Sequence, residues 1–128
     1  MQIISAKEYS LIDCLEEVSR NYQDRNREID GLSKLLKRLI LQLNEVSQTY
    51  RDSLFACWGN IEIEYAVMLS ENRKELSESE KNIVNASITN LLDLCSGIKR
   101  EYKIEENPYA WPSDEQLKVW NNKPEKLG

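Results

Sequence analysis

The strongest constraint on the fold is an apolar stripe between residues 11 and 50. Its members are separated alternately by four and three residues: Leu11, Leu15, Val18, Tyr22, Arg25, Ile29, Leu32, Leu36, Leu39, Leu43, Val46 and Tyr50. Only Arg25 in this series is charged. A repeat of 3.5 residues per turn keeps one face of a helix apolar, so this face has to be buried against another helix.

A polar stretch in the middle of the stripe leaves two interpretations, one continuous helix or two helices that fold back between residues 24 and 31. Asp30-Gly31 is typical of a helix end, and glycine in a helix interior costs about 1 kcal/mol relative to alanine. We therefore expect two helices, with Ser33 as a candidate cap of the second. Arg25 then lies at a helix end, where its charge reaches water.

Two capping-box patterns predict where helices begin. Ser5 precedes Glu8 by three residues, and Ser77 precedes Glu80 by the same spacing, so each pair is expected to satisfy exposed backbone amides of a first helical turn. A stripe with steps of four and three follows the second box: Val84, Ile88, Leu91, Cys95, Ile98 and Tyr102. This helix should end before Pro108, because the residue preceding a proline is disfavoured in helical geometry.

The segment from residue 54 to residue 67 has two interpretations. After Tyr50 the phase slips by one residue, and a new helical stripe comprises Leu54, Trp58, Ile61, Tyr65 and Met68. The slip fits either a stutter or a short turn around Gly59-Asn60. The alternation of apolar residues from Ile61 to Val67 also fits the second strand of a β-hairpin. We favour the helix, because an isolated hairpin is marginally stable in water.

These patterns predict an all-α protein, an antiparallel bundle of three to four long helices with coiled-coil-like heptad packing. The expected helices are residues 5–29, 32–57, 60–75 and 78–103, with the second and third either separate or continuous. Residues 1–106 form the expected bundle domain, and residues 107–128 a C-terminal tail with a short helix. The tail contains all three prolines, and Trp111, Leu117 and Trp120 are candidates for docking onto the bundle or a partner.

Charge and cysteine content exclude several classes of partner. The net charge is −5, which disfavours general binding to nucleic acid or anionic lipid. No apolar run has the length of a membrane span or a signal peptide, so we expect a cytoplasmic protein without membrane contact. The three cysteines, Cys14, Cys57 and Cys95, lie among apolar residues, which predicts buried thiols in a reducing compartment.

The side chains needed for common catalytic mechanisms are missing from the sequence. It contains no histidine, and its four glycines are too scattered for a phosphate-binding loop. Glu75 and Glu78 form the single ExxE pattern of the kind that holds magnesium in helical nucleotide hydrolases, but they fall between two predicted helices. We therefore expect no enzyme, no metal and no cofactor, with such a hydrolase as a remote alternative.

The second predicted helix gives the functional hypothesis. Its leucines and isoleucine cover more than one face, and a helix that is apolar on two sides needs two neighbours. We expect a regulatory or interaction module that forms a homo-oligomer or docks a protein partner through the following residues: Leu35, Leu36, Leu39, Ile40, Leu43, Val46 and Tyr50. A small acidic inhibitor or immunity-type protein that blocks a larger enzyme is the alternative.

Overall fold

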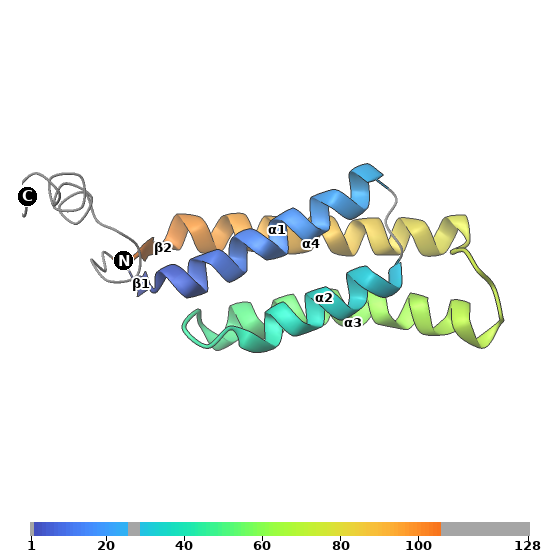
Figure 1. Ribbon diagram of the computed structural model, residues 1–128, viewed down its shortest axis with the longest axis horizontal. Helices are drawn as coiled ribbons and strands as arrows, with labels where there is room; N and C mark the ends of the chain where they lie inside the picture. The colour runs from blue at the N-terminus through green and yellow to red at the C-terminus, as the bar shows by residue number, and fades with distance from the viewer. Residues whose placement is uncertain (1, 26–28, 106–128) are drawn as a thin grey trace, which may run out of the picture.

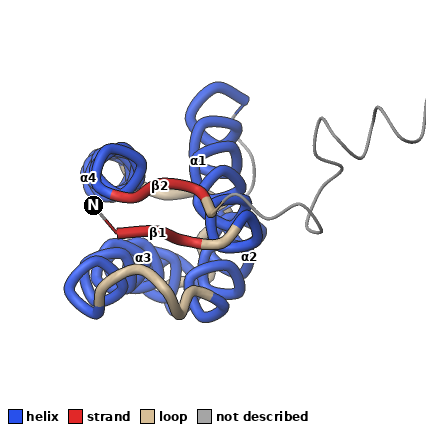
Figure 2. Tube along the Cα trace, turned by 90° about the vertical axis from the view of Figure 1, so that its left-hand side faces the viewer, coloured by secondary structure: helices blue, strands red, loops and turns tan. Residues whose placement is uncertain are grey.

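Four α-helices, each antiparallel to the one before it, form the protein (Figure 1). The computed structural model describes residues 2–25 and 29–105. The helices are α1 (Ala6–Arg25), α2 (Ile29–Gln42), α3 (Gln48–Ser70) and α4 (Glu78–Glu101). Each helix packs against two others, in the cyclic order α1, α2, α3, α4, and an end-on view shows the four at the corners of a square (Figure 2). The predicted all-α bundle is confirmed.

The core lies along the axis of this square and receives side chains from all four helices. Leu15, Leu36, Leu54, Ile61 and Leu91 are completely shielded from solvent. Burying a side chain of this size stabilises a fold by about 1.5–3 kcal/mol, so these positions supply much of the driving force for helix packing.

The break in the first stripe lies where the polar stretch predicted it. α1 ends at Arg25 and α2 begins at Ile29, with residues 26–28 and the Arg25 side chain outside the described part of the chain. The cap predicted at Ser33 is wrong, because Ser33 lies inside α2, is buried, and donates a hydrogen bond from its hydroxyl to Glu62.

A single continuous helix over residues 32–57 is also wrong, because the chain turns between Gln42 and Gln48. The Glu8 carboxylate, which is buried, accepts hydrogen bonds from the backbone amides of Asn44 at 3.1 Å, Glu45 at 2.8 Å and Val46 at 3.1 Å. These amides are thus satisfied outside a helix, and α2 ends. The Ser47 hydroxyl then caps α3 by accepting a 3.3 Å hydrogen bond from the amide of Tyr50.

The first predicted capping box is only half formed. The Glu8 amide donates to the Ser5 hydroxyl at 3.1 Å, but the Glu8 side chain turns away to the loop at residues 43–47. Glu45 of that loop takes its place, accepting hydrogen bonds from the Ser5 amide at 2.7 Å and from the Ser5 hydroxyl at 2.6 Å. Glu45 of the loop thus binds Ser5 at the start of α1, and Glu8 of α1 binds the loop amides. The two glutamates together join the start of α1 to the α2–α3 loop.

The hairpin alternative and the turn at Gly59-Asn60 are both wrong, since α3 runs without interruption through these residues. It ends at Ser70, earlier than the predicted residue 75, because Asn72 adopts a left-handed backbone conformation with φ 55°. The Arg73 amide donates to the Met68 carbonyl, and the Asn72 amide to the Leu69 carbonyl, both at 3.0 Å. This is the hydrogen-bond pattern of a Schellman motif, which asparagine accommodates more readily than most residues.

Two short strands, which the sequence patterns did not predict, close one end of the bundle. Strand β1 (Gln2–Ile4) pairs in parallel with β2 (Tyr102–Ile104), in the register that places Gln2 beside Tyr102 (Figure 2). α4 therefore ends at Glu101 rather than at residue 103. Three residues are too few to show the alternation by which a strand is recognised. The predicted tail at residues 107–128, with Trp111, Leu117 and Trp120, lies outside the described residues.

The Glu8 contact predicts a large effect on stability. Replacing Glu8 with alanine leaves three loop amides without their acceptor, and hydrogen bonds to a charged group contribute about 1.5–3 kcal/mol. We expect Glu8→Ala to lower the free energy of unfolding by about 3 kcal/mol, measured by urea denaturation. The matched control is Glu17→Ala on the exposed side of α1, which should change it by less than about 0.5 kcal/mol. Equal effects of the two variants would contradict this role.

Candidate interaction surface

The residues predicted to bind a partner lie mostly in the core of the single chain. Leu36 is fully buried, and Ile40, Leu43 and Val46 are nearly so. Leu35, Leu39 and Tyr50 are half-buried. The two neighbours required by the apolar faces of α2 are α1 and α3 of the same molecule. The remaining strongly apolar exposed position on α2 is Leu41, with 63% of its surface accessible.

A different apolar surface lies on the side of α3 that faces away from the bundle. We call it the α3 outer face. Its residues are separated by one, three or four positions and so lie on one side of the helix: Phe55, Ala56, Gly59, Ile63, Ala66 and Val67. Ile63 is 59% exposed, and Phe55 and Val67 are 39% and 38% exposed. Leu69, at the end of the same helix, is 52% exposed. α3 thus carries half of the strongly exposed large hydrophobic side chains found among the described residues.

Charged residues are sparse in α3 after its first turns, which contain Arg51 and Asp52. Between Ser53 and Ser70 the charged residues are Glu62 and Glu64, and both lie to the sides of the outer face. Surface helices ordinarily present charged residues opposite their buried stripe, and a helix that is apolar on all sides is usually covered on all sides. The composition of α3 is therefore that of a helix with one more neighbour than the bundle provides.

α2 covers only part of the flank of α3, because it has 14 residues against 23 in α3. Figure 1 shows the C-terminal end of α3, in yellow-green, extending past the start of α2. The exposed Leu69 belongs to this end.

Aromatic side chains mark the edge of the outer face next to α2. The rings of Phe55 and Trp58 lie 4.9 Å apart, and the ammonium of Lys37 lies 5.3 Å from the centre of the Trp58 ring. The Trp58 indole N–H donates to the Ser33 carbonyl at 2.9 Å, which holds the ring in place. The Trp58 ring is therefore held by contacts within the chain at the edge of the outer face.

Polar contacts fix α2 against α3 along the same edge. The Tyr65 hydroxyl donates to Asp30 at 2.6 Å, and the Ser33 hydroxyl donates to Glu62. The hydrogen bond from Tyr65, with a further contribution from Lys34, lowers the pKa of Asp30 below its usual value. The edge of the outer face is therefore held by contacts within the chain.

The outer-face residues were not predicted from the sequence, because heptad periodicity describes a single stripe of a helix. The signal was present in the alternation of Ile61, Ile63, Tyr65 and Val67, which resembles a strand. In the structure, Ile61 points into the core while Ile63 and Val67 are exposed. A helix that is apolar on two sides produces such an alternation over a short window.

A charged hollow between α1 and α4 is the other notable surface feature. It has a volume of about 590 Å³ and is lined by Asp13, Glu16, Glu17, Arg20, Asn21 and Lys99. Partial burial opposes the charge on Lys99, but its hydrogen bonds to Asp13 and Glu16 outweigh this and raise its pKa. Glu16 is also within 3.8 Å of Arg20. The charges are thus largely paired with one another and join the two helices.

The cysteines differ from one another in their surroundings. Cys57 and Cys95 are buried as predicted, and burial raises the pKa of the Cys95 thiol to about 12. Such a thiol carries almost no thiolate at neutral pH and is a poor nucleophile. The prediction for Cys14 is wrong: its side chain is exposed on α1, although its neighbours in the sequence are apolar.

The carboxylates considered for magnesium are not gathered into a site. Glu75 and Glu78 are both exposed, and Glu78 lies 3.9 Å from Lys81. Among residues 2–25 and 29–105, no three acidic, cysteine or histidine side chains lie close enough together to hold a metal ion. No helix in the described part of the chain is long and apolar enough to cross a membrane.

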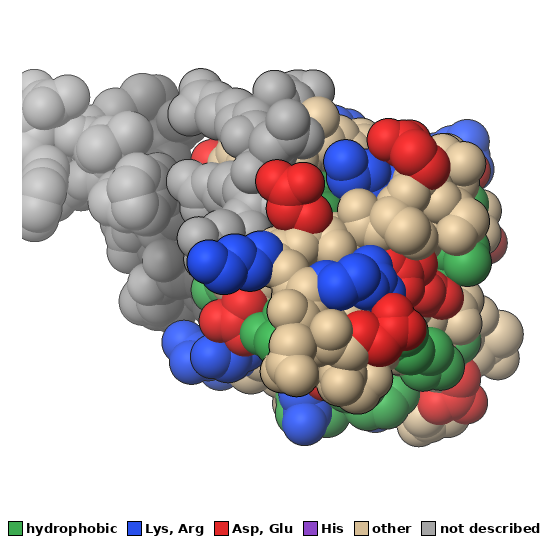
Figure 3. Space-filling model, turned by 90° about the vertical axis from the view of Figure 1, so that its right-hand side faces the viewer, with side chains coloured by type: hydrophobic (Ala, Val, Ile, Leu, Met, Phe, Trp, Pro, Cys, Tyr) green, Lys and Arg blue, Asp and Glu red, His purple; other side chains and the backbone are tan. Residues whose placement is uncertain are grey.

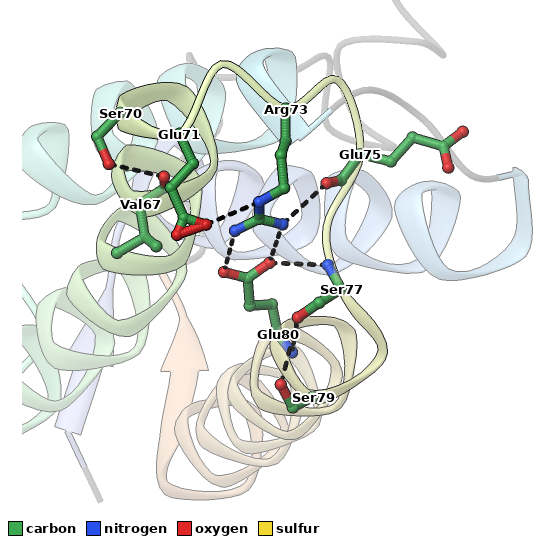
Figure 4. Close-up of polar contacts among 8 residues, drawn as sticks. All are labelled: Val67, Ser70, Glu71, Arg73, Glu75, Ser77, Ser79 and Glu80. Carbon is green, nitrogen blue, oxygen red and sulfur yellow. Dashed lines mark hydrogen bonds and ion pairs between the residues drawn. The ribbon is translucent and has the colours of Figure 1, made fainter.

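Acidic and basic side chains are mixed at the end of the bundle where α3 turns into α4 (Figure 3). In that turn the Arg73 guanidinium donates two hydrogen bonds to Glu80, each 2.7 Å long (Figure 4). Glu80 also closes the predicted capping box with Ser77, which is confirmed. The contact with Arg73 and the hydrogen bond from the Ser77 amide lower the pKa of Glu80 to about 2.

Comparison with known proteins gives no relative for this chain. No protein-family model matches it, and neither the curated proteins nor the solved structures contain a significant match. The function has to be inferred from the surface described above.

The pKa of Glu80 predicts how stability depends on pH. Because its pKa in the folded state, about 2, lies below the ordinary value of 4.5, ionised Glu80 stabilises the fold above pH 4.5. This contribution is lost as the pH falls from 4.5 towards 2. We expect Glu80→Gln to unfold at lower urea concentration than the parent at pH 7, with the difference shrinking below pH 4.5. The control is Glu78→Gln, two residues away and exposed, and a pH-independent difference for Glu80→Gln would contradict the prediction.

Proposed function

We propose that this protein is a non-catalytic helical interaction module that self-associates or docks a protein partner through an apolar helix face. The observation that carries the proposal is the α3 outer face, where three large hydrophobic side chains are exposed, and Asp52, near the start of the helix, is the charged residue in line with them. Contiguous exposed apolar surface of this kind usually marks a binding site.

The chemistry of the remaining surface supports binding rather than catalysis. In the charged hollow each acid has a basic neighbour or faces solvent, and the buried thiol of Cys95 is held in its unreactive form. The exposed apolar face supports including a regulatory role in the proposal, in which the domain acts by occupying the surface of another molecule. The alternative function, a small acidic inhibitor, would appear as a tight one-to-one complex with a basic target.

The test uses a pair of matched substitutions in the full chain. Ile63→Glu places a charge in the α3 outer face, and Ile104→Glu places the same charge on an exposed isoleucine of β2, at one end of the bundle. We expect the tagged parent and Ile104→Glu to be recovered from their host lysate with a bound protein or a second copy, seen by native mass spectrometry. Ile63→Glu should lose at least nine-tenths of that species, because burying the new carboxylate without a partner is costly.

Circular dichroism and urea unfolding verify that both variants are folded. A parent protein that is recovered as a bare monomer with metal or nucleotide bound would refute the proposal. Equal recovery of the bound species with both variants would also refute it, since the outer face would then be irrelevant to binding.

A further inference from the structure

We propose that the C-terminal tail of this chain binds back onto its own bundle, along the solvent-facing edge between α2 and α3. We call this surface the basic edge and define it by five residues: Lys37, Arg38, Leu41, Phe55 and Trp58. Its occupant is residues 111–120, which lie outside the described part of the chain. The inference goes beyond the proposed function, because the same chain fills this edge and leaves Ile63 and Val67 of the α3 outer face to a partner.

The first argument is the apolar surface of the basic edge. Leu41 is 63% exposed and follows Lys37 by one turn, so it lies on the side of α2 where Lys37 approaches Trp58. Because α2 and α3 are antiparallel, the turn after Lys37 lies beside the turn before Trp58, which contains Phe55 (Figure 1). Phe55 is 39% exposed. Two large hydrophobic side chains thus lie at the same level of the bundle and are open to solvent in the described part of the chain.

The second argument is the charge of α2. Three basic residues, Lys34, Lys37 and Arg38, outnumber Asp30 on this helix, whereas each of the other three helices contains more acidic than basic residues. Lys34 is paired with Asp30 at 3.1 Å. Lys37 and Arg38 lie one turn before Leu41 and form no ion pair with a carboxylate of the described residues. The basic edge therefore suits an occupant that has both large apolar side chains and carboxylates.

Residues 111–120 have this composition. Trp111, Leu117 and Trp120 are apolar, and the adjacent carboxylates of Asp114 and Glu115 lie between the first of them and the other two. A tryptophan side chain that becomes buried removes about 200 Å² of surface from water, which favours a docked tail. The two neighbouring carboxylates complement the two neighbouring cations of α2.

The third argument is the place where the tail begins. The described chain ends at Glu105, whose amide donates to the Ile4 carbonyl at 2.6 Å. The Ser47 amide donates to the Tyr102 hydroxyl at 2.9 Å, so the α2–α3 loop lies at the same end of the bundle as β2 (Figure 2). Leu41 belongs to the last turn of α2, directly before this loop. The tail therefore starts at the end of the bundle where the basic edge lies.

The reach of the chain is sufficient for this contact. Six residue steps separate Glu105 from residue 111, and an extended chain covers about 20 Å in that number. This is about twice the diameter of a helix. A segment tethered over such a short distance is present at an effective concentration in the millimolar range, so a small contact surface is enough to hold it.

The first experiment is hydrogen exchange of the full chain, followed by mass spectrometry. We expect the amides of residues 111–120 to exchange at least tenfold more slowly than those of a synthetic peptide of the same sequence. Leu41→Glu should remove this protection, because it places a charge where the tail makes apolar contact. The matched control is Ile83→Glu, at an exposed isoleucine near the start of α4 and the other end of the bundle, which should leave it unchanged.

Charge reversal tests which groups meet. Lys37→Glu combined with Arg38→Glu should remove the protection, and adding Asp114→Lys with Glu115→Lys should restore it, because the opposite charges are then exchanged but still complementary. Failure to restore protection in the folded fourfold variant would overturn the proposed contact.

The control for charge reversal is Lys74→Glu combined with Lys81→Glu. Both lysines are exposed and lie at the end of the bundle where α3 turns into α4, so the net charge changes by the same amount far from the basic edge. Protection of residues 111–120 should persist in this variant. Its loss there would mean that net charge alone controls the tail, and would overturn the proposal. Circular dichroism and urea unfolding verify that every variant is folded.

Other occupants of the basic edge give results that overturn the proposal. If the parent tail exchanges as fast as the synthetic peptide, the tail is not docked. If protection falls on dilution over the range in which sedimentation velocity shows a dimer dissociating, the tail binds a second copy.

Ile63→Glu separates this proposal from the proposed function. The substitution changes the α3 outer face alone, so tail protection that is unaffected by it supports docking at the basic edge, whether or not a partner is lost. If Ile63→Glu removes the protection and Leu41→Glu does not, the tail binds the outer face instead and the basic edge is excluded.

Discussion

The buried carboxylate of Glu8 is the contact on which the arrangement of the helices depends. It accepts hydrogen bonds from the backbone amides of residues 44–46, which lie just after the end of α2. These bonds connect the α2–α3 loop to the first turn of α1. Ser5 and Glu45 repeat the connection in the opposite direction. Because α3 begins immediately after this loop, the direction and position of α3 follow from a side chain that is 36 or more residues away in the sequence.

The cyclic packing of the four helices explains why α3 carries the unusual surface. Each helix contacts two neighbours and leaves one side in solvent. Polar and charged residues occupy most of that side of the other helices, while on α3 it carries Phe55, Ile63 and Val67. An added neighbour on this side would complete the burial that the composition of α3 demands.

Several elements were predictable because they depend on residues close together in the sequence. The break within residues 24–31 and the box formed by Ser77 and Glu80 are local features, and both are present, although Gly31 lies inside α2 and does not end a helix. The box expected at Ser5 and Glu8 has the same spacing but a different outcome, because Glu45 competes for Ser5. The spacing of residues within one helical turn does not predict a hydrogen-bond partner, such as Glu45, from a distant part of the chain.

The sequence by itself determined the helical class, since apolar residues three and four apart can be buried together only on helices that pack side by side. Tertiary structure decided which of those residues remain at the surface. α1 and α3 cover the members of the predicted set that lie on α2, and no helix of the described chain covers the outer face of α3. The apolar periodicity of a helix shows that one face must be buried. Which helix covers that face depends on the direction the chain takes through its loops, and long-range hydrogen bonds such as those of Glu8 set that direction.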